Sequence, residues 1–194
     1  MKHLGRKIYH ILGGLGLLSL YFIFHRNTAF AIYGVLILVV LLIEIARLRF
    51  SVLNNYIFTH VGGVIRENEA QKMTGTVPYV LGVGLSLYAY STPVATAAIC
   101  FLAFGDVAAT TIGERYGKTK IGGKSLEGTA AFIVASLLIG FLLPVVGLKL
   151  ASWVIILGAV TAAGIELLPL PLNDNLLIPI LAGGAMAFAS TLAN

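Results

Sequence analysis

Long apolar runs alternate with short polar segments along the 194 residues of this chain. A membrane-spanning helix needs about 20 mostly apolar residues, so the runs predict seven spans. They lie near residues 8–24, 29–46, 75–90, 93–112, 129–146, 150–167 and 175–193. Because lipid cannot satisfy open backbone groups, the spans are expected to be helices packed on helices. The pattern predicts an all-α, polytopic membrane protein with a single domain over residues 1–194.

Composition supports this prediction. Hydrophobic residues make up 58% of the chain, charged residues only 11%, and the mean hydropathy is +0.95. These values exclude an ordinary soluble domain. The first run is expected to be a retained span, because His25 and Arg26 follow it where a cleaved signal peptide would need small residues. Pro78 and Asp106 make the third and fourth spans the ones expected to be irregular or to line a polar cavity.

Cationic residues lie almost entirely in alternate connecting segments. One side carries Lys2, Arg6, Lys7, Arg47, Arg49, Arg66, Lys72, Arg115, Lys118, Lys120 and Lys124, and the other only Arg26 and Lys149. Positive residues favour the cytoplasmic side of a membrane. We therefore expect a cytoplasmic N-terminus, an external C-terminus and, in a prokaryote, a place in the cytoplasmic membrane. In the second connecting segment, Leu53, Ile57, Val61 and Val64 recur at helical spacing, which predicts an interfacial helix.

The segment FGDVAATTIGERYGKTKIGGKSLEGTAAF, residues 104–132, is polar and glycine-rich. Its GGKS is not a phosphate-binding P-loop, because Lys118 stands where that pattern needs glycine and a membrane helix precedes it. Read as a helix, it forms a small-residue stripe suited to close packing, made of Gly105, Ala109, Gly113 and Gly117. Asp106 lies beside this stripe. A charge there costs roughly 2.5–3.5 kcal/mol, which indicates either a functional carboxylate or one paired to a neighbouring helix.

Beyond that helix, glycines and cations predict a mobile loop whose backbone amides could wrap a phosphate. The glycines are Gly122, Gly123 and Gly128. The cations alone are equally typical of a topology signal. Each of the other polar residues predicted on the same side has a simpler explanation than function, namely interfacial snorkelling or a local ion pair. Glu44 and Arg47, at i and i+3, fit an ion pair best. Together, carboxylates and cations near a glycine-rich loop suit a nucleoside triphosphate with Mg²⁺.

Four segments, in order, resemble the CTP-dependent lipid-alcohol kinases. These comprise dolichol kinases, phytol kinases and CTP-using diacylglycerol kinases, distantly related to phosphatidate cytidylyltransferases. The segments are RKIYHILGG at 6–14, IRENEAQKMTGTVPYVLG at 65–82, residues 104–132, and IELLPLPLNDNLLIP at 165–179. The resemblance implies transfer of the γ-phosphate of CTP to a lipid hydroxyl at the cytoplasmic leaflet. The motif positions it carries over are Arg6, Lys7, His10, Arg66, Glu69, Asp106, Lys124, Ser125, Glu127, Gly128, Glu166, Asp174 and Asn175.

On physical grounds we assign roles to these positions. Asp106 and Asp174, with Glu69, are expected to hold Mg²⁺. Lys124 and Arg115 are expected to hold the phosphates, with Ser125 completing the cradle. Asp174 or Glu166 would accept the hydroxyl proton, and His10 is a weaker candidate. Nucleotide binding is further expected to involve Arg6, Lys7, His10, Arg66, Glu127, Gly128 and Asn175.

Two other functions stay open. A cytidylyltransferase would use the same metal chemistry but release pyrophosphate. A small transporter would also place an aspartate in a glycine-rich helix, but its polar residues should reach both faces, whereas here the predicted outer segments are almost uncharged. The acceptor could be a polyprenol, a phytol-like alcohol or diacylglycerol. The expected partners are CTP, the lipid acceptor and membrane lipids, with no nucleic acid; the oligomeric state is open, a homodimer being one possibility.

Overall fold

The computed structural model describes residues 4–65 and 69–192. The chain divides into two compact units, Met1–Leu81 and Gly82–Asn194. The boundary falls inside helix α4, Thr76–Ala89. The described residues are mostly helical, as the apolar pattern predicts.

The described residues of the first unit form three α-helices and the beginning of α4. The helices are α1 (Leu4–Ile23), α2 (Arg26–Arg49) and α3 (Ser51–Val61). The Tyr33 hydroxyl of α2 donates to the Leu17 carbonyl of α1, and the Tyr79 hydroxyl of α4 donates to the His10 carbonyl at 2.7 Å. Helix α3 confirms the helical periodicity predicted for the second connecting segment, although it ends at Val61, before the predicted position Val64.

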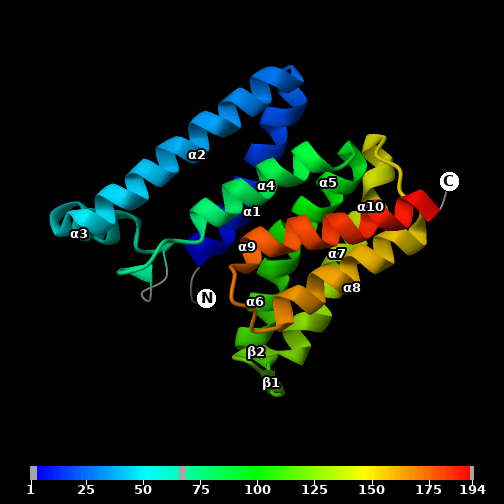
Figure 1. Cartoon of the computed structure of the whole chain (residues 1–194). Helices are drawn as coiled ribbons and strands as arrows, with labels where there is room; N and C mark the ends of the chain where they lie inside the picture. The colour runs from blue at the N-terminus through cyan, green and yellow to red at the C-terminus, as the bar shows by residue number, and fades with distance from the viewer. Residues whose placement is uncertain (1–3, 66–68, 193–194) are drawn as a thin grey trace. The chain divides into compact units, whose positions relative to one another are not determined.

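The second unit contains the rest of the described chain. Its elements after α4 are α5 (Thr92–Cys100), η2 (Phe101–Gly105), α6 (Asp106–Tyr116), β1 (Lys120–Ile121), β2 (Lys124–Ser125), α7 (Leu126–Leu142), η3 (Leu143–Val146), α8 (Ser152–Leu167), α9 (Asp174–Leu177), η4 (Ile178–Ala182) and α10 (Gly183–Leu192). Every residue of Val94–Cys100 in α5 is buried, so this helix forms the centre of the unit. Helix α7 packs along α8, and α10 also contacts α8 (Figure 1).

Four helical stretches among the described residues are long and apolar enough to cross a membrane. They are Arg26–Arg49, Thr92–Tyr116, Leu126–Val146 and Asp174–Leu192. This agrees with a polytopic membrane protein, but the predicted count of seven is not confirmed. The other three predicted runs are also helical, yet α4 and α8 have only 14 and 16 residues, and α1 carries Arg6, Lys7 and His10 among its apolar residues.

The predicted small-residue stripe packs tightly against α7. A side chain at Gly105 would come within 2.7 Å of the Phe132 ring, and one at Gly113 within 2.9 Å of the Ser125 hydroxyl. From the other side, a Cβ at Gly128 would lie 2.8 Å from the Ala109 carbonyl oxygen. The stripe therefore brings the backbone of α6 against the beginning of α7, as small residues allow between membrane helices.

The all-α prediction misses a small hairpin in the polar segment. Strands β1 and β2 pair antiparallel, with Lys120 opposite Ser125. Gly122 and Gly123 form the two-residue turn with φ values of 55° and 89°. Turns of this kind need positive φ at both central positions, which glycine adopts without strain. The prediction of one loop containing all three glycines is therefore wrong. Gly122 and Gly123 form a defined turn. Gly128 lies in α7, where its N–H donates to the Ser125 hydroxyl at 3.1 Å.

Candidate functional site

Lys124 joins two acidic residues that are distant in sequence. Its Nζ lies 3.0 Å from Asp174 Oδ2 and 3.3 Å from Glu166 Oε1. It also donates a hydrogen bond to the main-chain carbonyl of Glu166. The three residues come from strand β2, the end of α8 and the beginning of α9. We call Lys124, Glu166 and Asp174 the lysine–carboxylate cluster.

Local sequence explains why these elements meet. Helix α8 ends at Leu167, and the following residues PLPLN hold two prolines that cannot continue it. A side chain at Gly122 would lie 3.3 Å from Pro169, so the hairpin turn packs on this connection. The Asn173 side chain then caps α9 by accepting the Asn175 N–H at 3.0 Å, which places Asp174 in the first turn of α9.

Burial differs across the cluster. The Glu166 side chain is only 5% exposed, whereas those of Asp174 and Lys124 are 21% and 32% exposed. Partial burial acts to lower the pKa of Lys124, but the Asp174 and Glu166 carboxylates outweigh it, so the pKa is raised above its ordinary value. The lysine therefore carries its charge at neutral pH. Its ammonium neutralises one of two carboxylates that would otherwise repel each other.

Asp106 lies near this cluster. It is buried, 8% exposed, and is the first residue of α6. Its charge and that of Asp174 both act on the Glu166 carboxylate. The charge of Asp106 thus acts on the same carboxylate that binds Lys124.

Two π-helical turns adjoin these acidic residues. Turn η2 ends immediately before Asp106, and turn η4 follows α9, which begins with Asp174; the two turns contact each other. Such turns disturb the regular hydrogen-bond pattern and often occur at functional sites. At η4, the Tyr90 hydroxyl donates to the Ile180 carbonyl at 2.7 Å and the Ser86 hydroxyl to the Pro179 carbonyl at 3.3 Å. Sequence reasoning misses both hydroxyls.

The remaining predicted residues of the second unit have structural contacts beside the cluster. Ser125 caps α7, and the Glu127 carboxylate accepts the Thr119 N–H at 3.3 Å, which helps to close the base of the hairpin. Asn175 donates its N–H to the Asp174 carboxylate at 3.1 Å. Arg115 is exposed, with its guanidinium 5.3 Å from the centre of the Tyr116 ring.

The other predicted residues belong to the first unit. Arg6, Lys7 and His10 lie on α1, and Arg66 lies outside the described residues. The Glu69 carboxylate accepts the Gly75 N–H at 3.2 Å. Their predicted roles in nucleotide and metal binding stay predictions.

The predicted ion pair between Glu44 and Arg47 is confirmed. Two guanidinium nitrogens of Arg47 donate to the Glu44 carboxylate, at 2.7 and 3.0 Å. Thr74 donates both its N–H and its hydroxyl to the same carboxylate, at 2.9 and 2.8 Å. Arg47 also donates to the carbonyls of Glu69 and Lys72. This buried network fastens the segment before α4 to α2, so its role is structural.

Over residues 4–65 and 69–192, no group of three or more His, Cys, Asp or Glu side chains forms a ready metal site. The cluster nevertheless offers oxygen donors of the right chemistry, namely two carboxylates and a main-chain carbonyl. Mg²⁺ is commonly bound through one or two carboxylates, with substrate phosphates and water completing its coordination. The donor set therefore fits a magnesium ion that arrives with a nucleotide.

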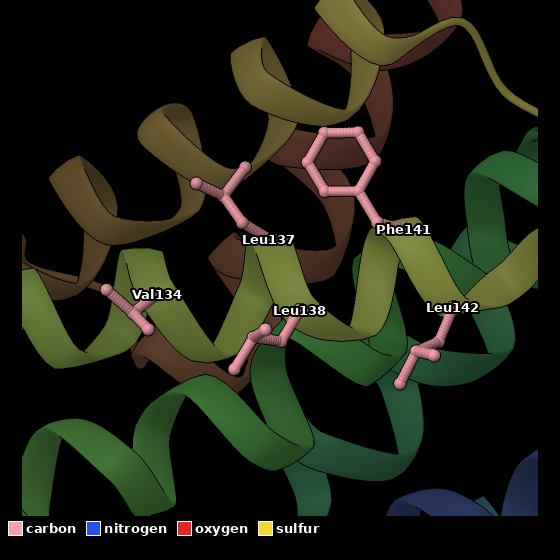
Figure 2. Close-up of a pocket in the computed structure, with 5 residues that line it drawn as sticks. All are labelled: Val134, Leu137, Leu138, Phe141 and Leu142. Carbon is pink, nitrogen blue, oxygen red and sulfur yellow. The ribbon is translucent and has the colours of Figure 1, made fainter.

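An apolar hollow of about 430 Å³ lies along α7 (Figure 2). Its lining residues are Val134, Leu137, Leu138, Phe141 and Leu142. None of them can bind phosphate or a metal ion. In a span such a surface suits hydrocarbon chains, so the hollow is no candidate for nucleotide binding.

Comparison with known proteins identifies the family. The CTP-dependent diacylglycerol kinase 1 of Saccharomyces cerevisiae is 33% identical to this chain over 143 residues, which are 69% of this chain and 48% of that protein. The protein of the same name from Eremothecium gossypii is 32% identical over 135 residues, covering 66% and 42%. The chain belongs to the family of CTP-dependent lipid kinases. It spans about half the length of these curated relatives or less.

Family membership confirms the resemblance drawn from the four segments. No family model matches the chain. No solved structure is similar to it. The lysine–carboxylate cluster thus lies in a chain of the CTP-dependent lipid kinase family.

Proposed function

We propose that this chain transfers the γ-phosphate of CTP to the hydroxyl of a lipid alcohol, with diacylglycerol as the acceptor. The observation that carries the proposal is the lysine–carboxylate cluster, in which one cation joins two carboxylates. The charge of a third carboxylate, Asp106, also acts on Glu166. Phosphoryl transfer depends mainly on positioning and charge neutralisation, and these residue types supply both. The names of the two relatives support CTP as donor and diacylglycerol as acceptor.

In the proposed reaction, the lipid hydroxyl oxygen forms a bond to the γ-phosphorus of CTP. The bond from that phosphorus to the oxygen bridging the β-phosphate breaks, and CDP leaves. The hydroxyl proton passes to a carboxylate of the cluster. Asp174 and Glu166 are both candidates for this role, with side chains 21% and 5% exposed.

Lys124 and Arg115 are proposed to neutralise the phosphate oxygens. Asp106 and Asp174 are the proposed Mg²⁺ ligands. The bound ion would offset the charge of the triphosphate. Because the cationic segments favour the cytoplasmic side, we propose that CTP enters from the cytoplasm and that the acceptor's tail lies among the helices.

The test is incubation of the purified chain with Mg²⁺, CTP labelled at the γ-phosphate, and diacylglycerol, a polyprenol or phytol. The proposal expects labelled phosphatidate and CDP, with CTP used faster than ATP. In a parallel incubation with phosphatidate in place of the alcohol, release of labelled pyrophosphate and formation of a CDP-activated lipid would show a cytidylyltransferase instead. Equal rates with CTP and ATP would remove the cytidine preference. Transfer to polyprenol or phytol but not to diacylglycerol would overturn the acceptor.

A further inference from the structure

The Lys124 ammonium lies within a set of oxygen donors. Around Nζ are Asp174 Oδ2 at 3.0 Å, Glu166 Oε1 at 3.3 Å and the Glu166 main-chain carbonyl oxygen. All three are hard oxygen ligands, the type that Mg²⁺ prefers. The ammonium therefore stands where these oxygens could hold a different cation.

We propose that Lys124 and a divalent cation occupy these oxygens in turn. Without nucleotide, the ammonium binds Glu166 and Asp174; when a polyphosphate arrives, Lys124 moves to the phosphate oxygens and the cation takes its place. The inference rests on the proposed function and goes beyond it, because it makes cation binding depend on release of the lysine. No bond is made or broken in this exchange.

Electrostatics makes the two occupants mutually exclusive. A divalent cation and an ammonium that share the same carboxylate oxygens would lie only a few ångströms apart. At an effective dielectric constant of about 20, one pair of unit charges 4 Å apart already interacts by roughly 4 kcal/mol, and a divalent ion doubles this. The carboxylates can therefore bind the ammonium or the divalent cation, but they bind the two together only weakly.

Lys124 can leave without a change in the hairpin. The Lys124 side chain is 32% exposed and has four rotatable bonds, so Nζ can swing away while the backbone stays paired. The acceptor oxygens, in contrast, belong to the ends of α8 and α9.

The experiment measures Mn²⁺ binding to the purified full chain without nucleotide or lipid, by electron paramagnetic resonance of the free ion. We expect weak binding by the wild type. Lys124→Met should bind one Mn²⁺ at least tenfold more tightly, because the competing charge is gone. Lys124→Arg should stay weak. Lys120→Met is the matched control, since it removes the same charge from an exposed position of the same hairpin.

Adding Asp174→Asn to Lys124→Met should abolish the gain. The exchange is overturned if a folded Lys124→Met protein binds Mn²⁺ no better than the wild type, or if Lys120→Met produces the same gain. Thermal unfolding in detergent checks folding, and Lys124→Gln replaces Lys124→Met if the latter is unfolded. The binding measurement contains neither CTP nor lipid, so it can be read separately from kinase activity. If Lys124→Met binds Mn²⁺ more tightly but the chain phosphorylates no lipid, only the proposed function is contradicted. If the chain is an active kinase but Lys124→Met shows no tighter Mn²⁺ binding, only the exchange is contradicted.

Discussion

The Lys124 ammonium lies 3.0 Å from the Asp174 carboxylate, although 50 residues separate them in the chain. The contact joins the hairpin of the glycine-rich segment to the beginning of α9. Two of the four segments that resemble the lipid kinases therefore meet at one ion pair. This relationship decides which variants should change catalysis and which only stability.

Replacing Lys124 with alanine should raise the KM for CTP and also lower kcat. The triphosphate is charged in the ground state as well as in the transition state, so a lysine that neutralises it acts in both. We expect kcat/KM to fall by at least a hundredfold, measured by steady-state kinetics over a range of CTP concentrations. Lys120→Ala in strand β1 is the control and should leave both constants within about twofold. An unchanged KM for CTP in Lys124→Ala would contradict phosphate binding by Lys124.

Replacing Asp106 with asparagine separates chemistry from folding. The variant keeps the shape of the side chain but removes a charge proposed to bind Mg²⁺. Losing a metal ligand should cost several kcal/mol of transition-state stabilisation, about a thousandfold or more in rate. The protein should remain folded, because a buried amide costs less than a buried carboxylate. Near-normal lipid phosphorylation by the folded variant would show that Asp106 is only a packing feature.

Local patterns predicted much of the fold. The apolar runs located the helices, and the spacing of Gly105 and Gly113 predicted the close packing that the structure shows against α7. The i, i+3 spacing of Glu44 and Arg47 predicted their ion pair. The hairpin was predictable too, because Gly-Gly between two short polar strands is a recognised turn signal.

Contacts between distant segments were not predictable in this way. Nothing local to Tyr90 indicates that its hydroxyl meets the Ile180 carbonyl, 90 residues away. Nor does the spacing of Lys124 and Glu166 reveal that a main-chain oxygen takes part in the cluster. The count of seven spans is not confirmed for a different reason: α4 and α8 are apolar but only 14 and 16 residues long, and an apolar run does not reveal where its helix ends.

Removing the Arg47 guanidinium should destabilise the first unit. Arg47 is 1% exposed and neutralises the buried Glu44. Breaking one side of a buried ion pair leaves an uncompensated charge and typically costs about 3–5 kcal/mol. Arg47→Met should therefore lower the thermal unfolding temperature in detergent, whereas Arg49→Met, at an exposed position of α2, should not. Equal unfolding temperatures for both variants would show that the network contributes little.

The predicted orientation can be tested by cysteine labelling in intact cells. Because cationic segments favour the cytoplasm, Lys120→Cys in the exposed strand β1 should react only with reagents that cross the membrane. Asn194→Cys should react with impermeant ones. Cys100, the native cysteine, is buried, and a Cys100→Ser background removes any signal from it. The reverse labelling pattern would place the glycine-rich segment outside and rule out cytoplasmic CTP as its substrate.

Removing the Tyr90 hydroxyl should affect the lysine–carboxylate cluster indirectly, through the main chain of η4. It donates to the Ile180 carbonyl in η4, immediately after the helix that begins with Asp174. Tyr90→Phe removes only this donor, so a partly buried carbonyl loses its partner at a cost of about 1–3 kcal/mol. If η4 positions Asp174, kcat should fall severalfold while the KM for CTP stays nearly constant. Tyr88→Phe, which removes the hydroxyl of an exposed tyrosine on α4, is the matched control and should leave kcat unchanged. A Tyr90→Phe protein with lowered thermal stability and unchanged kcat would show that this hydrogen bond stabilises the fold without positioning Asp174.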